Sequence, residues 1–159
     1  MSTSAAARRT VRLPSGPVLV GAVYGVCVVG LVAVFAGEIV VSDKDPYRSE
    51  GPVDSIVAIS VFGTVALVVG VVLALRLGGT PARARVGSLV LTALAVLTVV
   101  FFWAGAPGIL GACAAWCAGL TRDRQQLDGA ARVAGILGVF LALLNVVLSA
   151  GGVLLAGIT

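Results

Sequence analysis

Ionisable side chains are scarce in this chain of 159 residues, and histidine is absent. Charged residues make up 11% of the sequence, whereas soluble proteins contain about 25%. Without histidine, the chain lacks the side chain that most often changes its charge near neutral pH and the commonest metal ligand. None of the seven acidic residues lies at the centre of an apolar run. Pumps and proton-coupled transporters usually place ionisable groups inside the helix bundle, so this distribution argues against them.

The residue clusters on which enzymes and metal sites depend are also missing from the sequence. No nucleophile–base pair, metal-ligand cluster or phosphate-binding loop is visible. The three cysteines, Cys27, Cys113 and Cys117, lie inside apolar runs, where a thiol behaves as a small hydrophobic group. The acidic segment 43–50 lacks the spacing and the central glycine of a calcium loop. We therefore expect no catalytic residue, no metal and no cofactor.

Long apolar runs dominate what is present. Hydrophobic residues make up 59% of the chain, and the mean hydropathy is +1.12. An apolar run of about 18 residues or more is long enough to cross the roughly 30 Å hydrocarbon core of a bilayer as a helix. The sequence predicts an all-α polytopic membrane protein, with a basic cytoplasmic tail at 1–16 and a single transmembrane domain at 17–159. The five predicted transmembrane helices are 17–41, 55–75, 86–103, 107–121 and 133–157.

The fourth predicted helix depends on one turn signal. Residues 86–120 contain no charged side chain, and 35 uncharged residues are too many for one crossing. Pro107, flanked by Gly105 and Gly108, predicts the break between the third and fourth helices. A helix over 107–121 would be about 22 Å long, shorter than the hydrocarbon core. A full crossing and a re-entrant segment are both compatible with that length.

Basic residues predict the orientation of the helices. With five crossings and a cytoplasmic N-terminus, nine of the eleven basic residues face the cytoplasm, as the positive-inside rule requires. With four crossings the distribution falls to six against five. The nine are Arg8, Arg9, Arg12, Arg76, Arg83, Arg85, Arg122, Arg124 and Arg132. We therefore expect an N-in, C-out topology.

Amino-acid composition also predicts where in the cell the protein is located. A single lysine beside ten arginines, with abundant alanine, valine and glycine, suggests a GC-rich bacterial genome. The expected location is the bacterial plasma membrane. Arg8 and Arg9 precede the first apolar run, so a cleaved signal peptide is an alternative for that run. Its apolar stretch is longer than the 7–15 residues typical of such peptides.

The last fifty residues carry a family resemblance. Gly108–Ala112 (GILGA), then Gly119, a short arginine-containing turn, and Ala134–Gly138 (AGILG) form a pattern of small residues. This pattern resembles a domain-of-unknown-function family of small multi-helix membrane proteins from GC-rich Gram-positive bacteria. The resemblance covers about a third of the chain and implies no activity. Trp116 and the two nearby cysteines depart from it, because such proteins usually have aliphatic residues there.

Two polar residues are candidates for contacts within or beside the membrane. Asn145 lies about 13 residues into the last predicted helix, close to mid-bilayer, where an amide needs a hydrogen-bond partner. It either joins two helices or lines a polar path. Glu38 follows a 20-residue apolar span and falls at the outer boundary, where it is either hydrated or contacts an ion or partner.

Two stripes of small residues are candidates for helix packing. Gly111, Ala115 and Gly119 recur every fourth residue in the fourth predicted helix, and Gly21 and Gly25 do so in the first. Small residues at this spacing allow two helix backbones to approach closely. The approach can occur within one chain or between two chains, and the sequence leaves both open.

Together these features predict a small non-catalytic integral membrane protein, an accessory, scaffolding or modulating partner of a larger membrane assembly. The alternative is an oligomeric small transporter or channel subunit. An intramembrane enzyme that uses Cys113 and Cys117 ranks third. The expected partners are the lipid bilayer and either another membrane protein or a second copy of the chain, with no nucleic acid.

Overall fold

The computed structural model describes residues 13–42 and 52–156, and this part of the chain contains helices and loops but no strand. Three helices are 26 or 27 residues long, which corresponds to about 40 Å at 1.5 Å per residue. The elements in chain order are α1 (Gly16–Ser42), α2 (Pro52–Leu77), α3 (Pro81–Leu97), the 3-10 helix η1 (Thr98–Ala104), α4 (Ala106–Cys117) and α5 (Ala130–Ala156).

Four segments are long and apolar enough to cross a membrane, so the protein has the features of a membrane protein. They are Gly16–Ala33, Ser60–Leu77, Pro81–Phe102 and Ala130–Leu148. The remaining helix, α4, has 12 residues and is about 18 Å long. It is even shorter than the sequence predicts.

The bounds of α3 and α4 differ from the predicted ones for local reasons. Helix α3 begins at Pro81 rather than 86, because the Thr80 side chain accepts a hydrogen bond from the Arg83 N–H (3.4 Å) and proline suits the first helical turn. Helix α4 ends at Cys117 rather than 121. There the N–H groups of Gly119 and Leu120 bond back to the carbonyls of Trp116 and Ala115 and close the helix.

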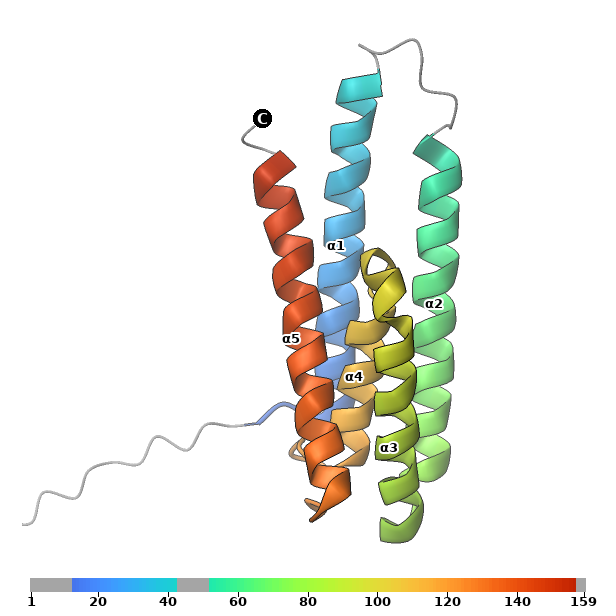
Figure 1. Ribbon diagram of the computed structural model, residues 1–159, viewed down its shortest axis with the longest axis vertical. Coiled ribbons are helices and arrows are strands. Elements are labelled where there is room, and N and C mark those ends of the chain that lie inside the picture. Colours follow the sequence, from blue (N-terminus) through green and yellow to red (C-terminus); the bar gives the residue numbers. More distant parts are fainter. Residues whose placement is uncertain (1–12, 43–51, 157–159) are drawn as a thin grey trace, which may run out of the picture.

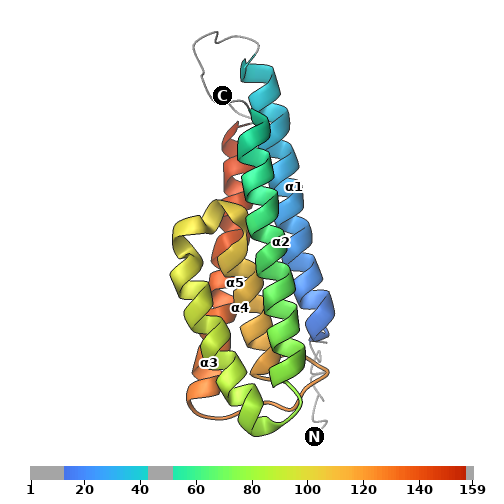
Figure 2. The same ribbon diagram turned by 90° about the vertical axis from the view of Figure 1, so that its right-hand side faces the viewer.

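Helices α3 and α4 form an antiparallel hairpin inside the bundle. Figures 1 and 2 show that it begins and ends at the end of the bundle where α1 and α5 start, and that its tip lies part-way along the three long helices. The chain reverses through the non-helical Phe101 (φ −102°, ψ 37°) and through Gly105, whose positive φ of 71° favours glycine. The break predicted at Gly105–Pro107 is therefore present, and it closes a hairpin of partial height.

Helix α4 lies at the centre of the molecule, and all twelve of its residues are buried. It packs against α1, α2, α3 and α5. Two hydroxyl groups join α3 to α5: Ser88 donates to the Ala131 carbonyl and Thr92 to the Ala134 carbonyl, both at 3.0 Å. Hydrogen bonds of this kind stabilise helix pairs in membranes.

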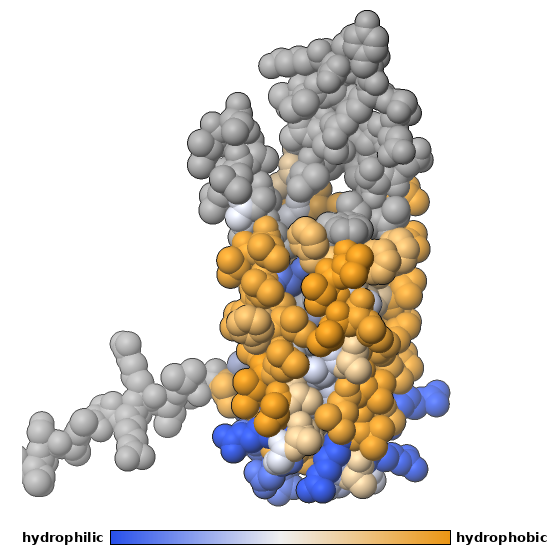
Figure 3. Space-filling model, viewed as in Figure 1, coloured by the Kyte–Doolittle hydropathy of each residue, from blue (hydrophilic) through white to orange (hydrophobic). Residues whose placement is uncertain are grey.

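The outer surface is largely aliphatic. Exposed valine, leucine and phenylalanine side chains form a broad apolar band over the long helices, and hydrophilic residues gather at the end where the hairpin is anchored (Figure 3). Exposed apolar patches of this size are unusual on a soluble monomer and suit a lipid environment.

Candidate functional site

Asn145 connects the hairpin tip to α5 and α1. Its side chain is 2% exposed and donates a hydrogen bond from Nδ2 to the Phe102 carbonyl of η1 (2.7 Å). Its Oδ1 accepts a weak hydrogen bond from the Cys27 thiol of α1 (3.5 Å). The amide thus contacts backbone that the kink in η1 has released from regular helical hydrogen bonding.

Glycine makes this approach possible. A side-chain carbon at Gly108 would lie 2.6 Å from Asn145 Oδ1, and one at Gly105 would overlap the Cys27 side chain. On the other side of the tip, the Phe101 and Phe62 rings stack with their centroids 5.4 Å apart, which joins η1 to α2. The tip is therefore held by all three long helices.

Gly111 lies at a close backbone contact between α4 and α5. A side-chain carbon there would overlap the Gly138 carbonyl, and one at Gly138 would lie 2.5 Å from the Gly111 carbonyl oxygen. Ala115 is fully buried in the same helix. Ala114 also faces α5, since a side-chain carbon added at Gly138 would lie 3.1 Å from Ala114 Cβ. A larger side chain at Ala114 would therefore collide with α5.

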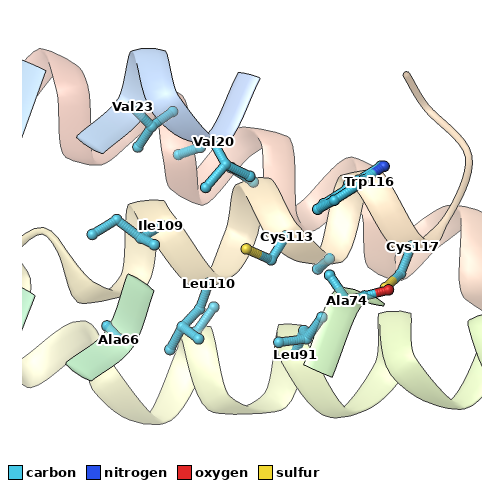
Figure 4. Close-up of a cluster of buried hydrophobic side chains, with 14 of the residues drawn as sticks. Val20, Val23, Ala66, Ala74, Leu91, Ile109, Leu110, Cys113, Trp116 and Cys117 are labelled. Atoms are coloured by element: carbon cyan, nitrogen blue, oxygen red, sulfur yellow. The ribbon is translucent and has the colours of Figure 1, made fainter. Parts of the chain in front are cut away.

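The rest of α4 packs against the other helices (Figure 4). Val20 and Val23 of α1 lie on one side of it, and Ala66 of α2 and Leu91 of α3 lie on the other. Cys113 is fully buried among these side chains. The four surrounding helices thus enclose α4 with small and aliphatic groups.

Gly119 does not belong to the packing stripe that the sequence predicts. It follows α4 and adopts a positive φ of 74°, the conformation that closes many helices. A side-chain carbon there would overlap the Gln125 carbonyl of the following loop. The interpretation of Gly119 as a helix-face residue is wrong, because the helix ends two residues earlier.

The two glycines of α1 pack against no other helix in the part of the chain that the structure describes. A side-chain carbon at Gly21 or Gly25 would meet no atom of the described residues within 4 Å. None of the described helices approaches this stripe closely. Glu38 is part of α1, but its side chain lies outside the described residues, as does the acidic segment 43–50.

A second polar cluster lies at the anchored end of the bundle. Asp123, in the loop between α4 and α5, accepts hydrogen bonds from the Gly16 N–H (2.7 Å) and from Trp116 Nε1 (2.9 Å). Gly16 is the first residue of α1, so the carboxylate caps the positive end of that helix. Burial raises the pKa of Asp123, but the hydrogen bonds from the Gly16 N–H and from Trp116 Nε1 outweigh it and hold the pKa below its ordinary value.

Arg124 caps the opposite kind of helix end. Its Nη2 donates to the Ala74 carbonyl (3.1 Å) in the last turn of α2, where the helix dipole favours a cation. Its guanidinium carbon lies 4.6 Å from the centroid of the Trp116 ring. A side-chain carbon at Gly78 would overlap the guanidinium, so glycine leaves it room. Asp123 and Arg124 together fasten the loop to α1 and α2.

Sequence reasoning did not identify this cluster. The signal that could have found it is an acidic and a basic residue side by side in a short loop, each suited to an opposite helix end. The partners, however, come from α1 and α2, which are 107 and 50 positions away in the chain. No local pattern specifies such contacts.

A cavity of about 190 Å³ lies between α1 and α2 beside the hairpin tip. Tyr24, Cys27, Val28 and Leu31 line it from α1, Ser60 and Gly63 from α2, and Ala104 and Ile109 from the hairpin. Its lining is mostly apolar with a few polar groups, which is typical of sites for small molecules.

Within the described ranges, no three histidine, cysteine or acidic side chains come together as metal ligands would. Comparison of the chain with family models, with curated proteins and with solved structures gave no match. The resemblance of segment 108–138 to a membrane-protein family therefore stays a prediction.

Proposed function

We propose that the protein is a small non-catalytic membrane protein that acts as an accessory or scaffolding partner of a larger membrane assembly. The observation that carries this proposal is the open small-residue face of α1. Glycine in a helix costs about 0.5–1 kcal/mol relative to alanine. At Gly21 and Gly25 no neighbour in the described chain requires a glycine, because the space beside both residues is open. The loss of helix stability at these positions therefore has no explanation within the described residues. A helix from another protein that packs closely against this face explains it.

The orientation proposed for this protein is N-in, C-out in the bacterial plasma membrane. Its support is the position of the arginines in the described helices and loops. Arg76 lies in the last turn of α2, Arg83 and Arg85 in the first turns of α3, and Arg124 in the α4–α5 loop. All of these positions belong to the end at which the hairpin is anchored. The positive-inside rule assigns that end to the cytoplasm.

The accessory role is tested by purifying the wild-type protein and its variants from mild detergent and comparing the proteins that remain bound to each. The wild-type protein should retain a stoichiometric membrane partner, and Gly21→Leu and Gly25→Leu should lose it with unchanged thermal stability, because a larger side chain keeps the two backbones apart. Val29→Leu, on an exposed part of the same helix, is the matched control and should retain the partner. A wild-type protein that purifies alone, or a partner that the glycine variants retain, would contradict the proposal.

A small transporter or channel subunit is the second candidate, and the hairpin tip favours it. Non-helical backbone at membrane depth occurs where protein encloses it or where it lines a cavity, and many transporters bind substrates at such breaks. The break at Phe101–Gly105 lies beside the cavity between α1 and α2. A homo-oligomer that conducts solutes across liposome membranes would support this role over the accessory one.

A further inference from the structure

The cavity between α1 and α2 has features of a binding site for a molecule that dissolves in the bilayer. Its walls are aliphatic and small side chains from two helices and the hairpin tip. Tyr24 lies within the apolar span Gly16–Ala33, and Ser60 within the apolar span Ser60–Leu77. The cavity is partly open, and most of the residues that line it belong to these two apolar spans, so a ligand can reach it from the surrounding lipid.

Two of the residues that line this cavity, Tyr24 and Ser60, carry hydroxyl groups. Neither Tyr24 nor Ser60 makes a hydrogen bond to any of the residues that the structure describes. In hydrocarbon, where water is scarce, a hydroxyl group without a partner is unfavourable, and a tyrosine inside a protein usually finds one. Ser88, Thr92 and Thr98 do have partners, since each donates to a backbone carbonyl.

We propose that this cavity binds the head of a lipid-soluble quinone, a six-membered ring that carries carbonyl oxygens. Both hydroxyl groups can donate to such oxygens, whereas the Cys27 thiol is already directed to Asn145. The ring itself contacts the aliphatic wall made by Val28, Leu31 and Ile109.

The size of the cavity agrees with a single ring. An engineered apolar cavity of about 150 Å³ in another protein holds benzene. The space here is about 190 Å³, which leaves room for small substituents on the ring. A longer apolar tail on the ligand would extend through the open side into the bilayer.

Binding of duroquinone tests the proposal. This tetramethyl benzoquinone has one ring, two carbonyl oxygens and no free ring position at which a thiol can add. Durene, the same methylated ring without oxygens, is the matched probe. The purified protein, in a quinone-free detergent, should show a saturable rise in its thermal midpoint with duroquinone. Durene should bind at least about fivefold more weakly, since it offers no acceptor.

Variants of the lining residues locate the site. Tyr24→Phe and Ser60→Ala each remove one hydroxyl group and should weaken duroquinone binding about fivefold to tenfold, with little effect on durene. Ser60→Leu fills the cavity and should abolish binding of both probes. Thr64→Val removes a hydroxyl from the same helix outside the cavity and should bind like the wild type.

Three outcomes would overturn the proposal. Equal affinity for duroquinone and durene would show that the space accepts any apolar group, such as a lipid tail. Unchanged binding in Ser60→Leu would place the quinone elsewhere. No saturable effect of duroquinone on a wild-type protein that unfolds cooperatively would exclude a quinone site in this cavity. Thermal unfolding of each variant without probe confirms that the comparison is made between folded proteins.

Discussion

Asn145 shows how one side chain can fix a break in the backbone. Replacement by leucine removes the donor to the Phe102 carbonyl and the acceptor for the Cys27 thiol. Interhelical hydrogen bonds in membranes contribute about 0.6–2 kcal/mol. Asn145→Leu should therefore lower the thermal midpoint in detergent by a few degrees. Val147→Leu, on the exposed side of the same helix, is the control. An unchanged midpoint in Asn145→Leu would show that the amide does not stabilise the tip.

Asp123 should make the anchored end of the bundle sensitive to acid. Its pKa is lower in the folded protein than the ordinary value of 3.8, so the folded state favours the carboxylate. The resulting stabilisation is fully present above about pH 4 and is lost as the pH falls through the lowered folded pKa. Thermal unfolding of the wild type and of Asp123→Asn measures this. The difference between them should be constant from about pH 8 to pH 5 and should shrink below about pH 4. A difference that varies between pH 8 and pH 5 would assign the effect to another group.

At the scale of the helices, the position of α4 is determined by close contacts with the helices around it. A single methyl group at Gly111 would overlap the Gly138 carbonyl. Overpacking of this kind costs about 1–3 kcal/mol. Gly111→Ala and Gly138→Ala should therefore lower the stability of the purified protein. Gly21→Ala, where the added methyl group meets open space, should be neutral or slightly stabilising. Equal stability of Gly111→Ala and Gly21→Ala would mean that α4 and α5 are farther apart than described.

The existence of each helix could be predicted from the sequence, because apolar length and turn residues determine where a chain can cross or reverse in lipid. The break at Gly105–Pro107 is an example. Helix bounds were less predictable, since the Thr80 cap and the closing turn at Gly119 depend on backbone hydrogen bonds of one or two residues.

Contacts between helices could not be predicted in the same way. The spacing of Gly111 and Ala115 indicates that α4 has a close-packing face, but not that α4 is buried on all faces. The contact of Asn145 with the Phe102 carbonyl joins residues 43 positions apart. It exists because the hairpin stops part-way, and hydropathy alone does not reveal where a hairpin stops.

For the whole molecule, the proposed N-in, C-out orientation rests on the arginines at the anchored end. Reporter fusions after Arg124 and after Thr159 test it. The first should report the cytoplasm and the second the outer side, because α5, which lies between them, is long and apolar enough to cross the membrane. Fusion after Arg76, at the end of α2, is a control that should agree with Arg124. A cytoplasmic C-terminus or an outer Arg124 would reverse the topology.

The depth to which the α3–α4 hairpin enters the membrane distinguishes two topologies. In one, three helices cross fully and the hairpin enters only part of the way, and in the other the chain crosses five times. The tip lies against Cys27, Gly63 and Asn145, which are about 17–22 Å from the anchored ends of their helices. In the proposed orientation, a hydrocarbon core of about 30 Å would cover the tip on the outer side. Val100→Cys, at a position 69% exposed on η1, should therefore resist a membrane-impermeant maleimide added from outside. Asp45→Cys, between α1 and α2, should react, and the wild type gives the background from native thiols. Rapid labelling of Val100→Cys in intact cells would show that α3 and η1 reach the outer surface and that α4 crosses back from it.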